Sequence, residues 1–113
     1  MSRQARSRVA IGLAAWASLS LAQTGSGQTN ITNITTGWAT EGFGLQTTSP
    51  IVNPAHCAVV DSYQVDNSVP GYKTYYAAAL LAFGMGRSVQ ITVSNTACTQ
   101  SRPSIIGIVV NAS

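Results

Sequence analysis

Apolar and polar residues alternate most clearly in SVQITVS, residues 88–94. In an extended chain, Val89, Ile91 and Val93 face one side, and Gln90 and Thr92 face the other. This period of two predicts a strand with one face in a core and the other in contact with water.

The segment before this strand, YKTYYAAALLAFGMG at residues 72–86, follows a helical period instead. Its apolar residues recur at i, i+4, i+7, i+8 and i+11, which places them on one face of a helix. This face consists of Tyr72, Tyr76, Ala79, Leu80 and Phe83. Asp66, Asn67 and Ser68 can all cap the start of this helix, and Asp66 is the expected N-cap. Gly84 and Gly86 are expected to end the helix.

Three further segments have the composition of strands. Residues 29–50 are rich in Thr, Ile and aromatic residues and are interrupted by glycines, which predicts two strands joined by a turn or bulge. Residues 55–65, AHCAVVDSYQV, predict a third strand, and residues 104–112, SIIGIVVNA, predict the last. This last segment is so apolar that both of its faces are expected to be covered, by the rest of the chain or by a neighbouring subunit. Residues 23–29 are predicted to be a flexible leader and residues 95–103 a polar loop.

The predicted fold class is therefore mainly β with one helix. Five strands, with the helix between the third and the fourth, follow the order of the OB-fold, a small Greek-key barrel. In such a barrel the helix covers one end and completes a core that the strands do not close alone. We expect residues 30–113 to form a single OB-like domain, with an open α+β sandwich of the same strands as the alternative.

The first residues predict export. MSRQARSR is basic, VAIGLAAWASLSL is an apolar run of 13 residues, and Ala22 precedes Gln23 where a signal peptidase would cut. This order is typical of a secretory signal peptide, here residues 1–22. A retained membrane anchor is the alternative, but the apolar run is shorter than the roughly 20 residues that span a bilayer. We therefore expect a periplasmic or extracellular protein without a transmembrane segment after cleavage.

Charge excludes one class of partner. In residues 23–113, three basic residues balance three acidic ones, and these are Lys73, Arg87, Arg102, Glu41, Asp61 and Asp66. Domains that bind nucleic acid cluster Lys and Arg on one face. A chain with so few charges is therefore not expected to bind nucleic acid.

The two cysteines, Cys57 and Cys98, predict a disulfide, because an even number of cysteines in an exported chain usually pairs. A metal site is the alternative. His56 beside Cys57 does not complete a ligand set, so neither a metal nor another cofactor is expected.

Catalysis is not expected either. His56, Asp61 and Ser62 are the residue types of a nucleophilic triad. No nucleophile-elbow sequence surrounds Ser62, and residue types alone are common. We therefore expect a protein that is not an enzyme.

Several segments in succession carry a resemblance. The segments that carry this resemblance are, in order, PIVNPAHC, the Tyr-rich helical segment, a glycine turn before a basic residue, VQITVS, a cysteine and RPSIIGIVV. The chain resembles small exported bacterial OB-like proteins and is similar to the B subunits of subtilase cytotoxin and of pertussis-like toxins. The resemblance covers roughly residues 30–110 and rests on element order and cysteine placement. It implies a noncatalytic subunit of a five-membered homo-oligomeric ring, which binds sialylated sugars through a serine and neighbouring polar residues. No segment of this chain matches that serine pocket, so no sugar-binding residue is carried over.

Four aromatic residues are the candidates for ligand binding, because aromatic rings can stack on sugar faces, and these are Trp38, Phe43, Tyr63 and Tyr75. Trp38 is either an exposed platform on the first two strands or a core residue. Three functions remain open: a module that binds a glycan or a partner protein, an envelope structural or interaction protein, and an inhibitor-like protein that presents residues 95–103 to an extracellular enzyme.

Overall fold

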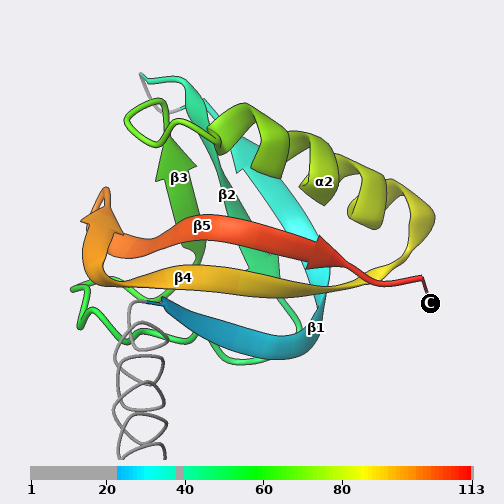
Figure 1. The fold of residues 1–113 in the computed structure, drawn as a ribbon, viewed down its shortest axis with the longest axis horizontal. Helices are drawn as coiled ribbons and strands as arrows, with labels where there is room; N and C mark the ends of the chain where they lie inside the picture. Colours follow the sequence, from blue (N-terminus) through cyan, green and yellow to red (C-terminus); the bar gives the residue numbers. More distant parts are fainter. Residues whose placement is uncertain (1–22, 38–39, 113) are drawn as a thin grey trace, which may run out of the picture.

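The strands form a ring in the order β1-β2-β3-β5-β4, which is the order of an OB-like barrel (Figure 1). This computed structural model describes residues 23–37 and 40–112, and within them it contains five strands and one helix. The elements are β1 (Gln23–Thr36), β2 (Gly42–Thr47), β3 (Tyr63–Asp66), α2 (Tyr72–Met85), β4 (Ser88–Thr99) and β5 (Arg102–Val110). The predicted fold class, mainly β with one helix between the third and fourth strands, is confirmed.

The ring closes most weakly between β3 and β5. These two strands are parallel and pair at one position, Gln64 opposite Ser104, whereas the other neighbours in the ring are antiparallel and pair over several residues. The strands therefore form a ring with a loose seam rather than a uniform barrel.

The core follows the predicted alternation along β4. Val89, Ile91 and Val93 are fully buried, while Gln90 is exposed. The inward-facing residues of the other strands meet them, and these are Ile31, Phe43, Leu45, Tyr63, Val65 and Ile105. One layer of mostly β-branched and aromatic side chains thus fills the ring.

The helix α2 lies against β1 and β5 and covers one end of the ring (Figure 1). It ends at the predicted Gly86, which adopts a left-handed φ of 65°, and the backbone N–H of Arg87 donates to the Ala82 carbonyl at 2.8 Å. Gly84, also predicted to end the helix, lies within it. Its N-cap is Gly71, without a side-chain cap. The predicted cap, Asp66, instead accepts a hydrogen bond from the backbone N–H of Ser68 at 3.0 Å, so that prediction was wrong.

The buried face of α2 agrees with the predicted one in part, because Tyr72, Tyr76 and Ala79 pack against the core as predicted. Ala79 and Ala82 are fully buried, whereas Leu80 and Phe83 are exposed. Small side chains let the helix backbone approach the strands closely, so the alanines make the contact and the larger residues remain in solvent. The exposed apolar residues on this helix are Leu80, Leu81, Phe83 and Met85.

Residues 23–29 are part of β1 and not a flexible leader. They pair with β4 from Gln23 opposite Ser94 to Thr29 opposite Val89, with a bulge between Gly25 and Gln28. Gly27 has a φ of 73°, which glycine adopts without strain. The Ser26 hydroxyl accepts a hydrogen bond from the backbone N–H of Ile91 at 2.9 Å and so replaces a bond that the bulge interrupts.

Two other predicted boundaries change. The third strand is Tyr63–Asp66, and residues 55–62 belong to a loop. Residues 95–103 are not a loop, because β4 continues to Thr99 and β5 begins at Arg102. Gln100 and Ser101, with φ of 49° and 66°, form a tight two-residue hairpin connection. The structure therefore offers no long loop at residues 95–103 for an inhibitor to present.

The connection from β2 to β3, residues 48–62, is held to the ring at several points. Cys57 and Cys98 form the predicted disulfide, with Cα atoms 5.8 Å apart. The Val59 N–H donates to the Ser101 carbonyl at 2.9 Å, and the Val52 N–H donates to the Tyr63 hydroxyl at 3.0 Å. We call residues 48–62 the tethered loop.

Removing the disulfide is expected to destabilise the fold. Replacing both cysteines by serine releases a cross-link between residues 41 apart, which corresponds to about 4 kcal/mol of unfolding free energy in the chain-entropy model. For a domain of this size, such a loss lowers Tm by roughly 15 °C or more. Thermal unfolding followed by circular dichroism, with and without reductant, measures this change. The serine double variant is the control, because reductant should not alter it; an equal Tm for oxidised and reduced wild type contradicts the prediction.

Candidate functional site

A polar groove lies on the outer face of the ring, over β1, β2 and β3. The hairpin between β4 and β5 and the end of the tethered loop form its opposite wall. Its volume is about 270 Å³, and its lining residues are Asn33, Thr35, Gln46, Asp61, Ser62, Gln64, Gln100 and Arg102. All eight are polar, and four of them are carboxamides. We call this feature the outer groove.

Strand register explains why these amides gather. Leu45 of β2 lies opposite Tyr63 of β3, and both are buried in the core. Their neighbours along the two strands, Gln46 and Gln64, therefore face the other side of the sheet. On β1, Asn33 lies opposite Gln46 and continues the row. The alternation that builds the core thus also builds a polar surface behind it.

Gln64 is the most enclosed of these amides, with an exposed fraction of 7%. Its side chain lies across Gly44, where a Cβ would stand only 2.5 Å from Gln64 Oε1. Gly44 therefore provides the space that this side chain occupies. Within the part of the chain that the structure describes, the Gln64 carboxamide has no hydrogen-bond partner. Among the described residues no buried side-chain polar atom lacks a partner, so the unbonded amide atoms of Gln64 reach solvent in the groove. There they can bond a group that enters it.

An ion pair forms the opposite wall. Arg102 Nε and Nη2 donate to the two carboxylate oxygens of Asp61 at 2.6 and 3.2 Å. The hydrogen bond from Arg102 holds the pKa of the Asp61 carboxyl below its ordinary value of 3.8, and the same bond raises the pKa of Arg102. Both side chains are partly exposed, so the pair contributes geometry more than stability. The guanidinium and the carboxylate also neutralise each other's charge within the groove.

Further bonds fix the edges of the groove. Arg102 Nη1 donates to the Gln100 carbonyl at 3.1 Å, and Gln100 Nε2 donates to the Thr40 hydroxyl at 3.3 Å. Gln46 Nε2 donates to the Asp61 carbonyl at 3.1 Å. The β4–β5 hairpin and the tethered loop are thereby both connected to the β1–β2 side of the molecule.

The aromatic residues predicted to bind a ligand do not form this site. Phe43 and Tyr63 are exposed by only 1% and 0%, so their rings are core residues and cannot serve as stacking platforms. The Tyr63 hydroxyl accepts the Val52 N–H, and burial raises the pKa of that hydroxyl. Tyr75 is half-buried with its ring over Gly71. Trp38 lies outside the described residues, as does the predicted signal peptide.

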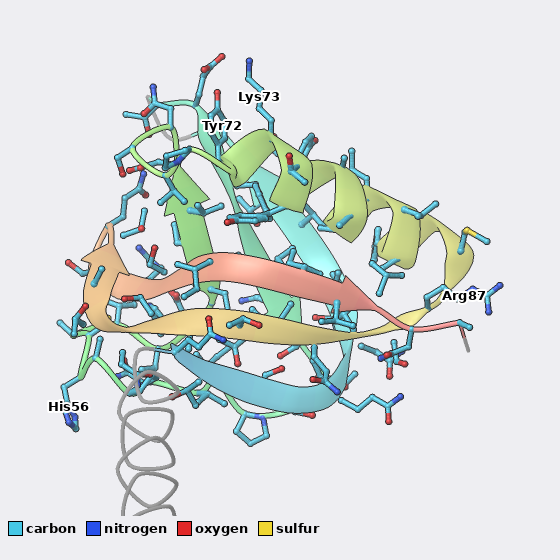
Figure 2. The ribbon with its side chains drawn as sticks, in the orientation of Figure 1. His56, Tyr72, Lys73 and Arg87 are labelled. Carbon is cyan, nitrogen blue, oxygen red and sulfur yellow. A yellow bond between two sulfur atoms is a disulfide. The ribbon has the colours of Figure 1, made fainter. Side chains whose placement is uncertain are left out.

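A separate, larger cavity of about 610 Å³ lies between α2 and the β1–β2 connection, away from the outer groove. The Tyr72 hydroxyl donates to Glu41 Oε2 at 2.6 Å, which raises the pKa of Tyr72, and Lys73 Nζ lies 5.9 Å from the centre of the Tyr72 ring. Tyr72 and Lys73 lie together at the start of α2 (Figure 2). The wall includes Gly37 and Thr40, on either side of residues 38–39, which the structure does not describe, so we assign no site here.

The residue types of a nucleophilic triad are not assembled. Ser62 Oγ donates to Asp61 Oδ1 at 3.1 Å. His56 points into solvent on the tethered loop (Figure 2), and among the described residues its ring has no partner. In the same residues, no group of three or more His, Cys, Asp or Glu side chains is arranged to hold a metal ion.

Sequence reasoning missed the outer groove, although part of its signal was present. Gln46 and Gln64 each stand next to a strongly apolar strand residue, Leu45 and Tyr63, and strand alternation puts them on the outer face. The contact between Asp61 and Arg102 joins residues 41 positions apart, and local sequence contains no sign of it.

The Asp61–Arg102 pair predicts a defined pH dependence. Because the folded-state pKa of Asp61 is depressed, the pairing is fully present above pH 3.8 and is lost as the pH falls through the lower folded-state pKa. An NMR titration of the Asp61 carboxyl carbon should give a midpoint below 3.8. Arg102→Gln should move that midpoint upward toward the ordinary value. A midpoint that does not respond to Arg102→Gln contradicts the assigned cause.

Comparisons with known proteins do not place the chain in a family. No protein-family model, no curated protein and no solved structure matches it. Among the described residues, no helix has both the length and the apolar character needed to cross a membrane.

Proposed function

We propose that this protein is a noncatalytic binding module that recognises a glycan in the outer groove. The observation that carries the proposal is the Gln64 carboxamide, which is 7% exposed, lines the groove and has no partner within the described residues. Sugar hydroxyls both donate and accept hydrogen bonds. A carboxamide has two donors and an acceptor, so Gln64 and its neighbours Asn33 and Gln46 match that chemistry.

The charge balance of the groove favours an uncharged ligand. Asp61 and Arg102 are the charged residues in its lining, and they pair with each other. A nucleic acid requires uncompensated cations along its phosphates, and the groove provides none from its lining residues. A neutral sugar needs no counter-charge and can bond the amides directly.

The position of the groove on the fold supports the same proposal. OB-folds bind oligosaccharides and oligonucleotides on the face of their second and third strands, between the first–second and fourth–fifth connections. The outer groove lies on β2 and β3, and Gln100 of the β4–β5 hairpin reaches Thr40 before β2. The resemblance to toxin B subunits also implies glycan binding, although it implies anionic sialylated sugars, whereas the paired charges of this groove favour neutral ones. An exported location fits the disulfide, because such bridges persist in oxidising compartments.

A second candidate function is an interaction protein without a small ligand. The observation that favours it is the set of exposed large apolar side chains on α2, which are Leu80, Leu81, Phe83 and Met85. These residues carry no charge, so the matching surface would be another apolar face, as on a second copy of the chain. In this case the outer groove would have no ligand.

A glycan array on the oxidised protein, with its mass measured in solution, tests the proposal. We expect saturable binding to a defined set of glycans. Gln64→Met keeps the side-chain volume but removes the amide, which should cost about 1–3 kcal/mol of binding free energy, or roughly 5- to 150-fold in Kd. Gln90→Met is the matched control, because Gln90 is exposed on β4 outside the groove.

Two outcomes contradict the proposal. A blank array from folded protein removes the glycan ligand, and a multimeric mass in that case favours the second candidate. Equal losses of affinity in Gln64→Met and Gln90→Met would mean that the glycan binds elsewhere on the molecule.

A further inference from the structure

We propose that the ligand is an extended oligosaccharide chain of at least two sugar units, which occupies the outer groove together with a second cavity next to it. This inference rests on the proposed function and specifies the class of glycan. It follows from how the two cavities meet on the outer face of β1 and β2.

The second cavity has a volume of about 490 Å³ and lies between the β1–β2 surface and the tethered loop. It shares two lining residues, Gln46 and Asp61, with the outer groove. The two hollows therefore lie side by side, with Gln46 and Asp61 between them. Their combined size falls within the roughly 300–1,000 Å³ of small-molecule sites.

The boundary between the two cavities is polar. Gln46 Nε2 donates to the Asp61 backbone carbonyl at 3.1 Å, so a hydrogen bond between a side chain and the loop backbone lies on this boundary. The Gln46 Oε1 atom keeps its capacity to accept a bond there. A chain of linked sugars can pass over this point while a hydroxyl donates to that oxygen.

The chemistry changes along the path. The outer groove is lined by polar residues, whereas the second cavity adds Pro50, Ile51 and Val60 as an apolar wall facing Thr32 and Ser49. Val60 is 52% exposed, which is high for a valine. A pyranose ring has an apolar C–H face and polar hydroxyl edges, so a wall of this kind matches a second sugar unit better than a charged or purely polar ligand.

The spacing of the two cavities is fixed before any ligand binds. Val60 lies between Val59, whose N–H donates to the Ser101 carbonyl at 2.9 Å, and Asp61, which is paired with Arg102. The disulfide at Cys57 holds the same loop a few residues earlier. A preorganised site loses less conformational entropy when it binds a linked ligand.

An extended peptide is the competing occupant, and strand pairing argues against it. A peptide that adds to a sheet needs an unpaired strand edge. Over the outer groove, β2 is paired with β1 on one side and β3 on the other, so its backbone bonds are already used. At the loose seam, β3 has four residues and meets β5 at Gln64, so a peptide would find only a short edge there. What the groove offers is side chains, which suit a ligand rich in hydroxyl groups.

Calorimetric titration with sugars of increasing length tests the inference. The probes are chito-, manno- and cello-oligosaccharides of one to four units, added to the oxidised full-length protein. In the series that binds, we expect affinity to rise at least tenfold between one unit and three units and then to level off as both cavities fill. Val60→Gln should remove most of that gain without changing the affinity for the single sugar. Val109→Gln is the matched control, because Val109 is 49% exposed on β5 and lines neither cavity.

The failures of the two proposals are distinguishable. If sugars of every length bind with the same affinity, the proposal of glycan binding stands, but the proposal of an extended oligosaccharide ligand is overturned. A Val60→Gln variant that loses affinity for one unit as much as for three also overturns it. If none of the probes binds and the glycan array is blank, both proposals fall.

Discussion

The disulfide between Cys57 and Cys98 is the constraint on which the candidate site depends. The ring is weakest where β3 meets β5, since these strands share one paired position, and β3 itself has four residues. The tethered loop enters the molecule at this weak side. The disulfide fixes it to β4, Val59 and Asp61 add bonds to its later part, and the Tyr63 hydroxyl bonds Val52 in its earlier part. The wall of the outer groove therefore stays in place without extensive strand pairing.

The same strands supply both the core and the groove. On β2 and β3, Leu45 and Tyr63 point inward and are fully buried, while Gln46 and Gln64 point outward and line the groove. Gly44 leaves room for the Gln64 side chain to lie flat across β2. A substitution at any of these positions would alter both the packing of the core and the recognition of a ligand in the groove. In contrast, α2 covers the end of the ring through Ala79 and Ala82 and takes no part in the groove.

Much of the fold could be predicted from the sequence because its signals are local. The alternation at residues 88–94 predicts β4. The helical period before it, with a glycine at the end of the helix, predicts α2. The prediction that residues 23–29 form a flexible leader was wrong, because these residues pair with β4 as a strand and the Ser26 hydroxyl bonds that strand as well. Neither contact is visible in the local sequence. Aromatic content alone could not separate the buried rings of Phe43 and Tyr63 from exposed ones. The groove depends on contacts such as Asp61 with Arg102, which form only when distant segments meet.

The central claim is that Gln64 bonds a sugar in the outer groove. The most direct measurement is an NMR titration that follows the side-chain amide signals of the glutamines and asparagines while the glycan selected by the array is added. The account predicts saturable shifts of the Gln64, Gln46 and Asn33 signals, with the Gln90 signal unchanged. Saturable shifts confined to residues of α2, with the Gln64 signal unmoved, would contradict it.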